Sequence, residues 1–204
     1  LHALILFIVN FLDNIMVSSV SNEAVSAVYA VNQVTYILMI AGYGVIIGAG
    51  VFIQQFNGAN DVKNMKQAFC YKCIIMLLFL AVAVTVFYIF GPSIVYLYCR
   101  SDSNSSEIFR LAKIYLYTMI LSYIPYCLSI IYTTTVREIG QTKYALIAGG
   151  VAFGVNLVLN AIFIYVLGLG VFGAALGTII ARVIELIVIV VICHKKKFSF
   201  CHKL

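Results

Sequence analysis

The sequence predicts an all-α membrane protein, a polytopic bundle of about six transmembrane helices. Of its 204 residues, 64% are hydrophobic and only 10% are charged, and the mean hydropathy is +1.08. A soluble domain of this size does not need so much apolar surface. The apolar residues come in blocks of about 20, the length with which an α-helix crosses a hydrocarbon core of about 30 Å, whereas β-barrel strands alternate over about 10 residues.

The whole chain, 1–204, is expected to form a single transmembrane domain. Its spans are expected at about 1–17, 31–53, 70–90, 111–136, 144–167 and 174–193. The first span ends in a polar turn, in which Ser21 or Asn22 is expected to cap the next helix. Glycines in the second span allow neighbouring helices to approach closely, which is how membrane helices pack in an apolar solvent.

Glycine, proline and asparagine set the expected limits of the later spans. The turn signal Asn57-Gly58 predicts a loop over residues 54–66, and Gly91-Pro92 predicts the end of the third span. Pro125 lies near the middle of the fourth span, where it removes one backbone donor and predicts a kink. Polar or glycine-rich segments precede the fifth and sixth spans.

The distribution of basic residues predicts the orientation of the chain. If the first span runs outwards from the cytoplasm, the cytoplasmic loops hold Lys63, Lys66, Arg137, Lys143, Lys195, Lys196, Lys197 and Lys203. The outer loops then hold Arg100, Arg110 and Lys113. This distribution obeys the positive-inside rule, so both ends of the segment are expected to be cytoplasmic, in a multi-pass protein of the cell membrane.

Asp13 places a carboxylate inside the apolar first span. An isolated aspartate at mid-bilayer depth costs about 2.5 to 3.5 kcal/mol on insertion scales, and such residues usually face a cavity or a partner inside the bundle. Asp13 is therefore a functional candidate. The alternative is that it lies near the helix end, where it caps the helix or contacts water.

Asn156 and Asn160 lie four residues apart in the fifth span, a spacing that puts both carboxamides on one helical face. Together with Asp13 they offer one carboxylate and two amide oxygens to a small hard cation or a proton relay. Asparagines also join membrane helices through hydrogen bonds worth about 1 to 2 kcal/mol in model peptides. On spacing alone, the structural interpretation is slightly favoured.

The sixth span contains Arg182 and Glu185, an opposite-charge pair at i, i+3 on one face. A structural clamp is the favoured interpretation of this pair, and a role in gating is the alternative. Thr178 lies one turn before Arg182 and is placed to offer a hydroxyl to a cavity, although threonine on a membrane helix usually bonds its own backbone.

Other classes of function find little support in the sequence. The net charge of +6 is spread over short loops, so no basic face of a soluble module exists to bind nucleic acid. Cys70 and Cys73 have zinc-ligand spacing but no second pair and no nearby histidine, so no metal is expected there. All three histidines lie near the termini, and no nucleophile motif or carboxylate pair lies within a span, so the chain is not expected to be an enzyme.

An ordered set of motifs resembles the amino-terminal six-helix lobe of the MATE multidrug and toxin extrusion transporters. The set covers nearly the whole chain and consists of Leu12–Val17, Gln54–Asp61 with the lysines that follow, Thr134–Thr142, Asn156–Tyr165 and Gly170–Thr178. The third of these, Thr-Thr-Val-Arg-Glu-Ile-Gly-Gln-Thr, is similar to the family's Leu-Arg-x-x-Gly-Asp-Thr loop. Each motif is weak alone, but their order is specific.

The resemblance implies a twelve-helix antiporter of two lobes that exports cationic or amphipathic drugs and toxins in exchange for protons or sodium. The family's amino-lobe cation site maps by motif to Asp13, Asn156, Asn160 and Thr178. This mapping favours the functional interpretation of the two asparagines. It also implies the lipid bilayer, a small-molecule substrate and a second lobe as partners, a proton or a sodium ion at Asp13 as the coupling ion, and no other cofactor.

Two departures from the family's pattern leave alternatives open. Many relatives carry an aspartate where this chain has Asn160, so a proton mechanism with two carboxylates is in doubt. Only six spans are present, so the chain is expected to be a fragment, a partial gene product or a half-size protein that pairs with another copy. An exporter like the lipid-linked oligosaccharide flippases of the same superfamily and a non-transporting fragment are the alternative functions.

Overall fold

The computed structural model describes residues 15–100 and 105–201, and within these ranges the ordered secondary structure is entirely helical. The elements are α2 (Asn22–Gly58), α3 (Val62–Cys99), α4 (Ser105–Glu138), α5 (Thr142–Ala161), the π-helical segment η1 (Ile162–Val166) and α6 (Gly170–Lys195). Five helical segments of the described chain are long and apolar enough to cross a membrane, with α5 and η1 counted as one. The predicted all-α polytopic bundle is therefore confirmed, and most of the expected first span lies outside the described residues.

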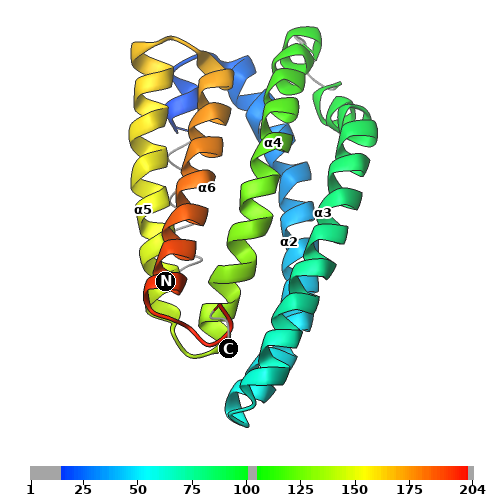
Figure 1. The fold of residues 1–204 in the computed structure, drawn as a ribbon. Coiled ribbons are helices and arrows are strands. Elements are labelled where there is room, and N and C mark those ends of the chain that lie inside the picture. The colour runs from blue at the N-terminus through cyan, green and yellow to red at the C-terminus, as the bar shows by residue number, and fades with distance from the viewer. Residues whose placement is uncertain (1–14, 101–104, 202–204) are drawn as a thin grey trace.

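Successive helices run antiparallel, and α4 occupies the centre of the bundle. Figure 1 shows α4 between the α5–α6 pair on one side and the α2–α3 pair on the other. The helix contacts agree, because α4 packs against α2, α3, α5 and α6. The α2–α3 turn, the α4–α5 turn and the end of α6 lie at one end of the bundle. Side chains on the faces of α4 therefore meet all the other described helices.

The start of α2 follows the sequence prediction. Ser21 is the N-cap, and its hydroxyl accepts a hydrogen bond of 3.0 Å from the backbone N–H of Ala24. This bond satisfies one of the N–H groups that every helix start leaves without an intrahelical partner.

The expected loop over residues 54–66 is wrong, because α2 continues to Gly58 and α3 begins at Val62. Only residues 59–61 turn the chain, and Asn60 adopts a positive φ of 56° there. Asn57 and Gly58 thus lie at the end of the helix rather than in the turn. Asp61 caps α3, with Asn64 donating to its carboxylate from the backbone N–H at 3.1 Å and from Nδ2 at 2.6 Å.

The predicted end of the third span at Gly91-Pro92 is also wrong. Helix α3 continues through Pro92 to Cys99, one of the longest helices of the described chain. A proline removes one backbone donor, but the apolar residues that follow still have a core to pack against, since Val95 and Cys99 are buried there. In a membrane the remaining backbone groups also need their helical partners, which favours continuation over unwinding.

Candidate cation site

The structure brings three of the predicted site residues together between α5 and α6. Asn160 Nδ2 donates to Asn156 Oδ1 at 3.3 Å, and Asn156 Nδ2 donates to Thr178 Oγ1, also at 3.3 Å. Thr178 Oγ1 in turn donates to the backbone carbonyl of Ala174 at 3.0 Å. Asn156 and Asn160 are 5% and 0% exposed, so the carboxamides lie inside the bundle and not on its lipid face. Asp13, the fourth predicted residue, lies outside the described residues.

Gly177 on α6 makes room for the Asn160 side chain. A Cβ atom at position 177 meets Asn160 Oδ1 well inside van der Waals contact, and it lies only 3.2 Å from the Cγ atom. The Gly177 backbone is fixed in helix α6, and the Asn160 carboxamide is held by its hydrogen bond to Asn156, so an added methyl group would displace the carboxamide from that bond. The approach of α6 to α5 therefore depends on the absence of a side chain at Gly177.

The three side chains supply hard, neutral oxygen ligands of the kind that small cations prefer. An amide oxygen has two lone pairs, so the one hydrogen bond that Asn156 Oδ1 accepts from Asn160 leaves it able to bind a cation. None of the three titrates, however. A residue that binds a proton, or whose negative charge compensates a bound cation, must therefore lie elsewhere. The sequence predicts that this residue is Asp13.

A change of helical pitch follows the cluster directly. After α5 ends at Ala161, the chain forms the π-helical segment η1 over Ile162–Val166. Single π-turns within helices often occur at functional sites, because they shift the register of the side chains around them. The sequence carries no signal for this segment that period or composition could detect.

The predicted Arg182–Glu185 pair forms on α6, with Arg182 Nη1 2.9 Å from Glu185 Oε2. The guanidinium also lies over the ring of Tyr126 on α4, 5.0 Å from its centroid. Asn156, Asn160 and Thr178 form what we call the asparagine cluster. Arg182 and Glu185 lie one and two turns beyond Thr178 on α6, so the pair borders this cluster. These contacts fit the structural clamp that the sequence favours.

Sequence reasoning missed a second buried ion pair, between Lys72 on α3 and Glu138 at the end of α4. Lys72 Nζ lies 2.7 Å from both carboxylate oxygens of Glu138 and 3.1 Å from Thr135 Oγ1, so all three of its protons have acceptors. The side chains are 0% and 7% exposed. The sequence feature that could have predicted this pair is a lone lysine two residues inside an apolar span. We interpreted only the Cys-x-x-Cys spacing around it.

Gly50 on α2 completes this ion-pair cluster. A Cβ at position 50 runs into the Glu138 carboxylate, so a side chain there would force the ion pair to shift. Three helices therefore meet at Lys72, Glu138 and Gly50, at the end of the bundle where the α4–α5 turn lies (Figure 1).

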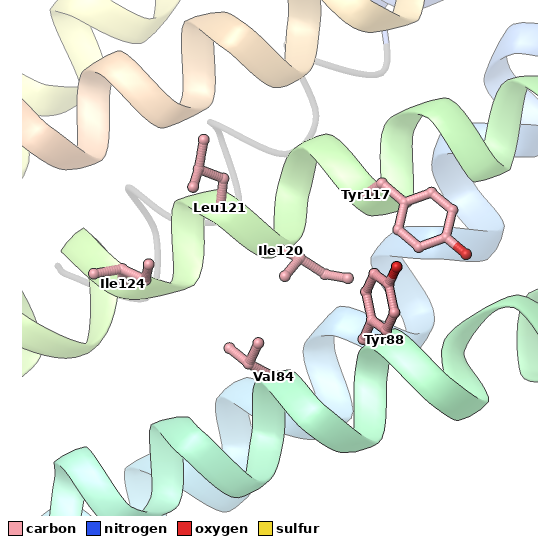
Figure 2. A pocket seen from close by; sticks show the side chains of 6 residues that line it. All are labelled: Val84, Tyr88, Tyr117, Ile120, Leu121 and Ile124. Atoms are coloured by element: carbon pink, nitrogen blue, oxygen red, sulfur yellow. The ribbon is translucent and has the colours of Figure 1, made fainter.

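An open apolar groove of about 510 Å³ lies elsewhere, between α3 and α4. Figure 2 shows its lining, in which Tyr88 of α3 faces Tyr117 of α4 with ring centroids 5.6 Å apart. The remaining lining residues are Val84, Ile120, Leu121 and Ile124. This groove has no charged side chain in its lining, and it shares no residue with the asparagine cluster.

A membrane helix bundle with a buried cluster of polar side chains is typical of secondary transporters, whose ion and substrate sites lie near the bilayer midplane. The MatE family model matches residues 1–162, so the chain belongs to the MATE family. It is 29% identical over 193 residues to the uncharacterized transporter YisQ of Bacillus subtilis (strain 168), covering 90% of this chain and 40% of that protein. MATE proteins are transporters and not enzymes.

The fold agrees with solved MATE structures. A crystal structure of MATE in the bent conformation superposes with a TM-score of 0.86 at 24% identity, covering 96% of this chain and 43% of that one. The outward-facing conformation of a multidrug resistance MATE family transporter of the MOP superfamily gives a TM-score of 0.83 at 25% identity, with 100% and 44% covered. The chain thus spans less than half the length of these relatives and corresponds to one lobe.

Proposed function

We propose that this protein is a cation-coupled antiporter that exports cationic or amphipathic drugs and toxins in exchange for protons or sodium. The observation that carries the proposal is the buried chain of hydrogen bonds from Asn160 through Asn156 to Thr178. These are the residues to which the family's amino-lobe cation site maps. A second transmembrane lobe, or another copy of this chain, is needed to complete the path for substrate.

Coupling follows from the charge of Asp13. A carboxylate without compensation inside the membrane is costly, by about 2.5 to 3.5 kcal/mol on insertion scales. Binding a proton or a cation removes that cost, so the lobe has two states of different charge in its interior. A substrate that competes with the ion, or a lobe movement that exposes Asp13 to one side at a time, then links export to the ion gradient.

Two observations favour drug cargo over an anionic lipid-linked sugar. The outward-facing relative is described as a multidrug resistance transporter. In the described residues, the two cations that point into the bundle are each paired with a glutamate, Lys72 with Glu138 and Arg182 with Glu185. Neither therefore offers an uncompensated positive charge to a pyrophosphate.

The test is Asp13→Asn in the complete protein, reconstituted into vesicles with an imposed proton or sodium gradient. Asparagine keeps the size of the side chain and removes its charge, so gradient-driven export of a cationic dye is expected to fall to background. Facilitated equilibration of the dye without a gradient is the control for folding. Export that still follows the gradient in Asp13→Asn rejects the proposed coupling.

A further inference from the structure

Two polar stripes face each other across the contact between α4 and α6. On α4, Ser122, Tyr126, Ser129 and Thr133 recur at i, i+4, i+7 and i+11, the spacing of one helical face. On α6, Thr178, Arg182 and Glu185 recur at i, i+4 and i+7. The two helices pack directly against each other, and Arg182 lies over the Tyr126 ring at 5.0 Å. We refer to these seven residues as the polar seam.

Two hydroxyls in the seam have no hydrogen-bond partner among the described residues. Tyr126 OH and Ser129 Oγ are both buried and unpaired, and Ser129 is only 1% exposed. Their neighbours on the stripe differ, because Ser122 Oγ donates to the Met119 carbonyl at 2.7 Å and Thr133 Oγ1 to that of Ile130 at 3.4 Å. A buried polar group without a partner costs about 1–3 kcal/mol, so two on adjacent turns need an explanation.

Bound water can supply the missing partners. A buried water needs two to four polar partners, and sites with such partners hold water whereas apolar cavities stay dry. The seam offers these partners in succession, from the Thr178 hydroxyl through the Arg182–Glu185 pair to Tyr126 and Ser129. At Thr178 the seam joins the Asn156–Thr178 hydrogen bond. From there it runs along α4 and α6 towards the end of α4 that carries the α4–α5 turn.

We propose that the polar seam binds a file of water molecules that extends from the asparagine cluster towards the membrane face at which α4 and α6 end. The waters accept hydrogen bonds from the Arg182 guanidinium, donate to the Glu185 carboxylate and pair with the hydroxyls of Tyr126 and Ser129. The functional consequence rests on the proposed function: the file carries the coupling proton along the seam, between the cation site and the half of the membrane towards which the seam extends.

Radiolytic hydroxyl-radical footprinting of the complete protein tests for the water itself, because radicals formed from bound water oxidise the side chains beside it. Tyr126 is expected to be modified several-fold faster than Tyr132. Tyr132 is the matched control, since it is a tyrosine on the same helix, is also half-buried and packs against apolar clusters. Equal protection of Tyr126 and Tyr132 overturns the proposal.

Tyr126→Phe tests the function of the file. With water in place, removing the hydroxyl is expected to slow gradient-driven export several-fold and to leave the melting temperature nearly unchanged. A variant that melts higher and exports like the wild type shows a dry seam, because removing an unpaired buried hydroxyl then only relieves its cost. Since footprinting does not depend on transport, a failure of Asp13→Asn to affect coupling rejects the proposed function while leaving the water file intact.

Discussion

At the scale of single residues, the Lys72–Glu138 pair makes the clearest energetic prediction. Removing one partner leaves the other charge buried and unpaired, which costs about 3–5 kcal/mol, whereas replacing both by apolar residues is often neutral or stabilising. We therefore expect Lys72→Met and Glu138→Leu each to lower the melting temperature strongly and the double variant Lys72→Met/Glu138→Leu to recover most of the loss. Thermal unfolding of the purified protein in detergent measures all three.

The controls for this prediction lie on α2 and α4. Gly50→Ala pushes a methyl group into the Glu138 carboxylate and is expected to destabilise, while Gly48→Ala meets nothing within 4 Å and is expected not to. The exposed pair Arg110–Glu107 on α4 is expected to show no measurable coupling. Losses that simply add in the Lys72/Glu138 double variant contradict the prediction, because interacting partners are not additive.

Gly177 allows the cation site to be tested without changing a ligand. Gly177→Ala displaces the Asn160 carboxamide, so we expect weaker binding of the coupling ion, by about tenfold if one ligand contact worth about 1.4 kcal/mol is lost. Gly154→Ala on α5 is the matched control, because the added methyl group there meets nothing within 4 Å. Ion binding is measured by calorimetry on the complete protein, and equal affinities of the two variants count against the site.

At the scale of the helices, hydrophobic length and composition predicted the five long apolar helices of the described residues, because a membrane helix needs an unbroken apolar run. The ends were harder to predict. Pro92 and the Asn57-Gly58 turn signal are breakers in water, where an unwound backbone finds hydrogen bonds with solvent. In this bundle α3 continues through the proline to bury Val95 and Cys99, a tertiary effect that the local sequence does not contain.

The start of α3 depends on Asp61, which accepts two hydrogen bonds from Asn64. Both bonds hold the pKa of the Asp61 carboxyl below its usual value of 3.8, and the bond from the Asn64 backbone has the larger effect. A carboxyl whose pKa is depressed by folding stabilises the folded state above its unfolded pKa, and this contribution is lost as the pH falls through its folded pKa. We therefore expect Asp61→Ala to melt at a lower temperature than the wild type at neutral pH.

The difference between Asp61→Ala and the wild type is expected to shrink as the pH falls through the folded pKa of Asp61, which lies below 3.8, because the protonated carboxyl loses its charge and keeps only a neutral acceptor oxygen. Asp61→Asn keeps an oxygen that caps the helix, so its melting temperature is expected to lie closer to that of the wild type at neutral pH. Thermal unfolding over a series of pH values measures both. A difference that persists unchanged in acid is the contrary result.

At the scale of the whole molecule, the sequence predicted the partners within the candidate site better than the contacts between distant helices. Asn156 and Asn160 share a helical face by spacing alone, and Thr178 was placed near them by its resemblance to the family. The Lys72–Glu138 pair joins residues 66 positions apart, so no periodicity relates them. Only the packing of α3 against α4 brings them together.

The orientation of the bundle is the remaining prediction. Lys63, Arg137 and Lys195 lie at the end of the bundle that holds the α2–α3 and α4–α5 turns, and this end is expected to face the cytoplasm. Single cysteines at the exposed positions Thr142 and Leu169, in a variant without native cysteines, report the two sides. Because a membrane-impermeant maleimide reaches only the outer face of intact cells, we expect it to label Leu169→Cys at once and Thr142→Cys only after permeabilisation. The reverse pattern establishes the opposite orientation, in which the polar seam extends from the asparagine cluster towards the outer face.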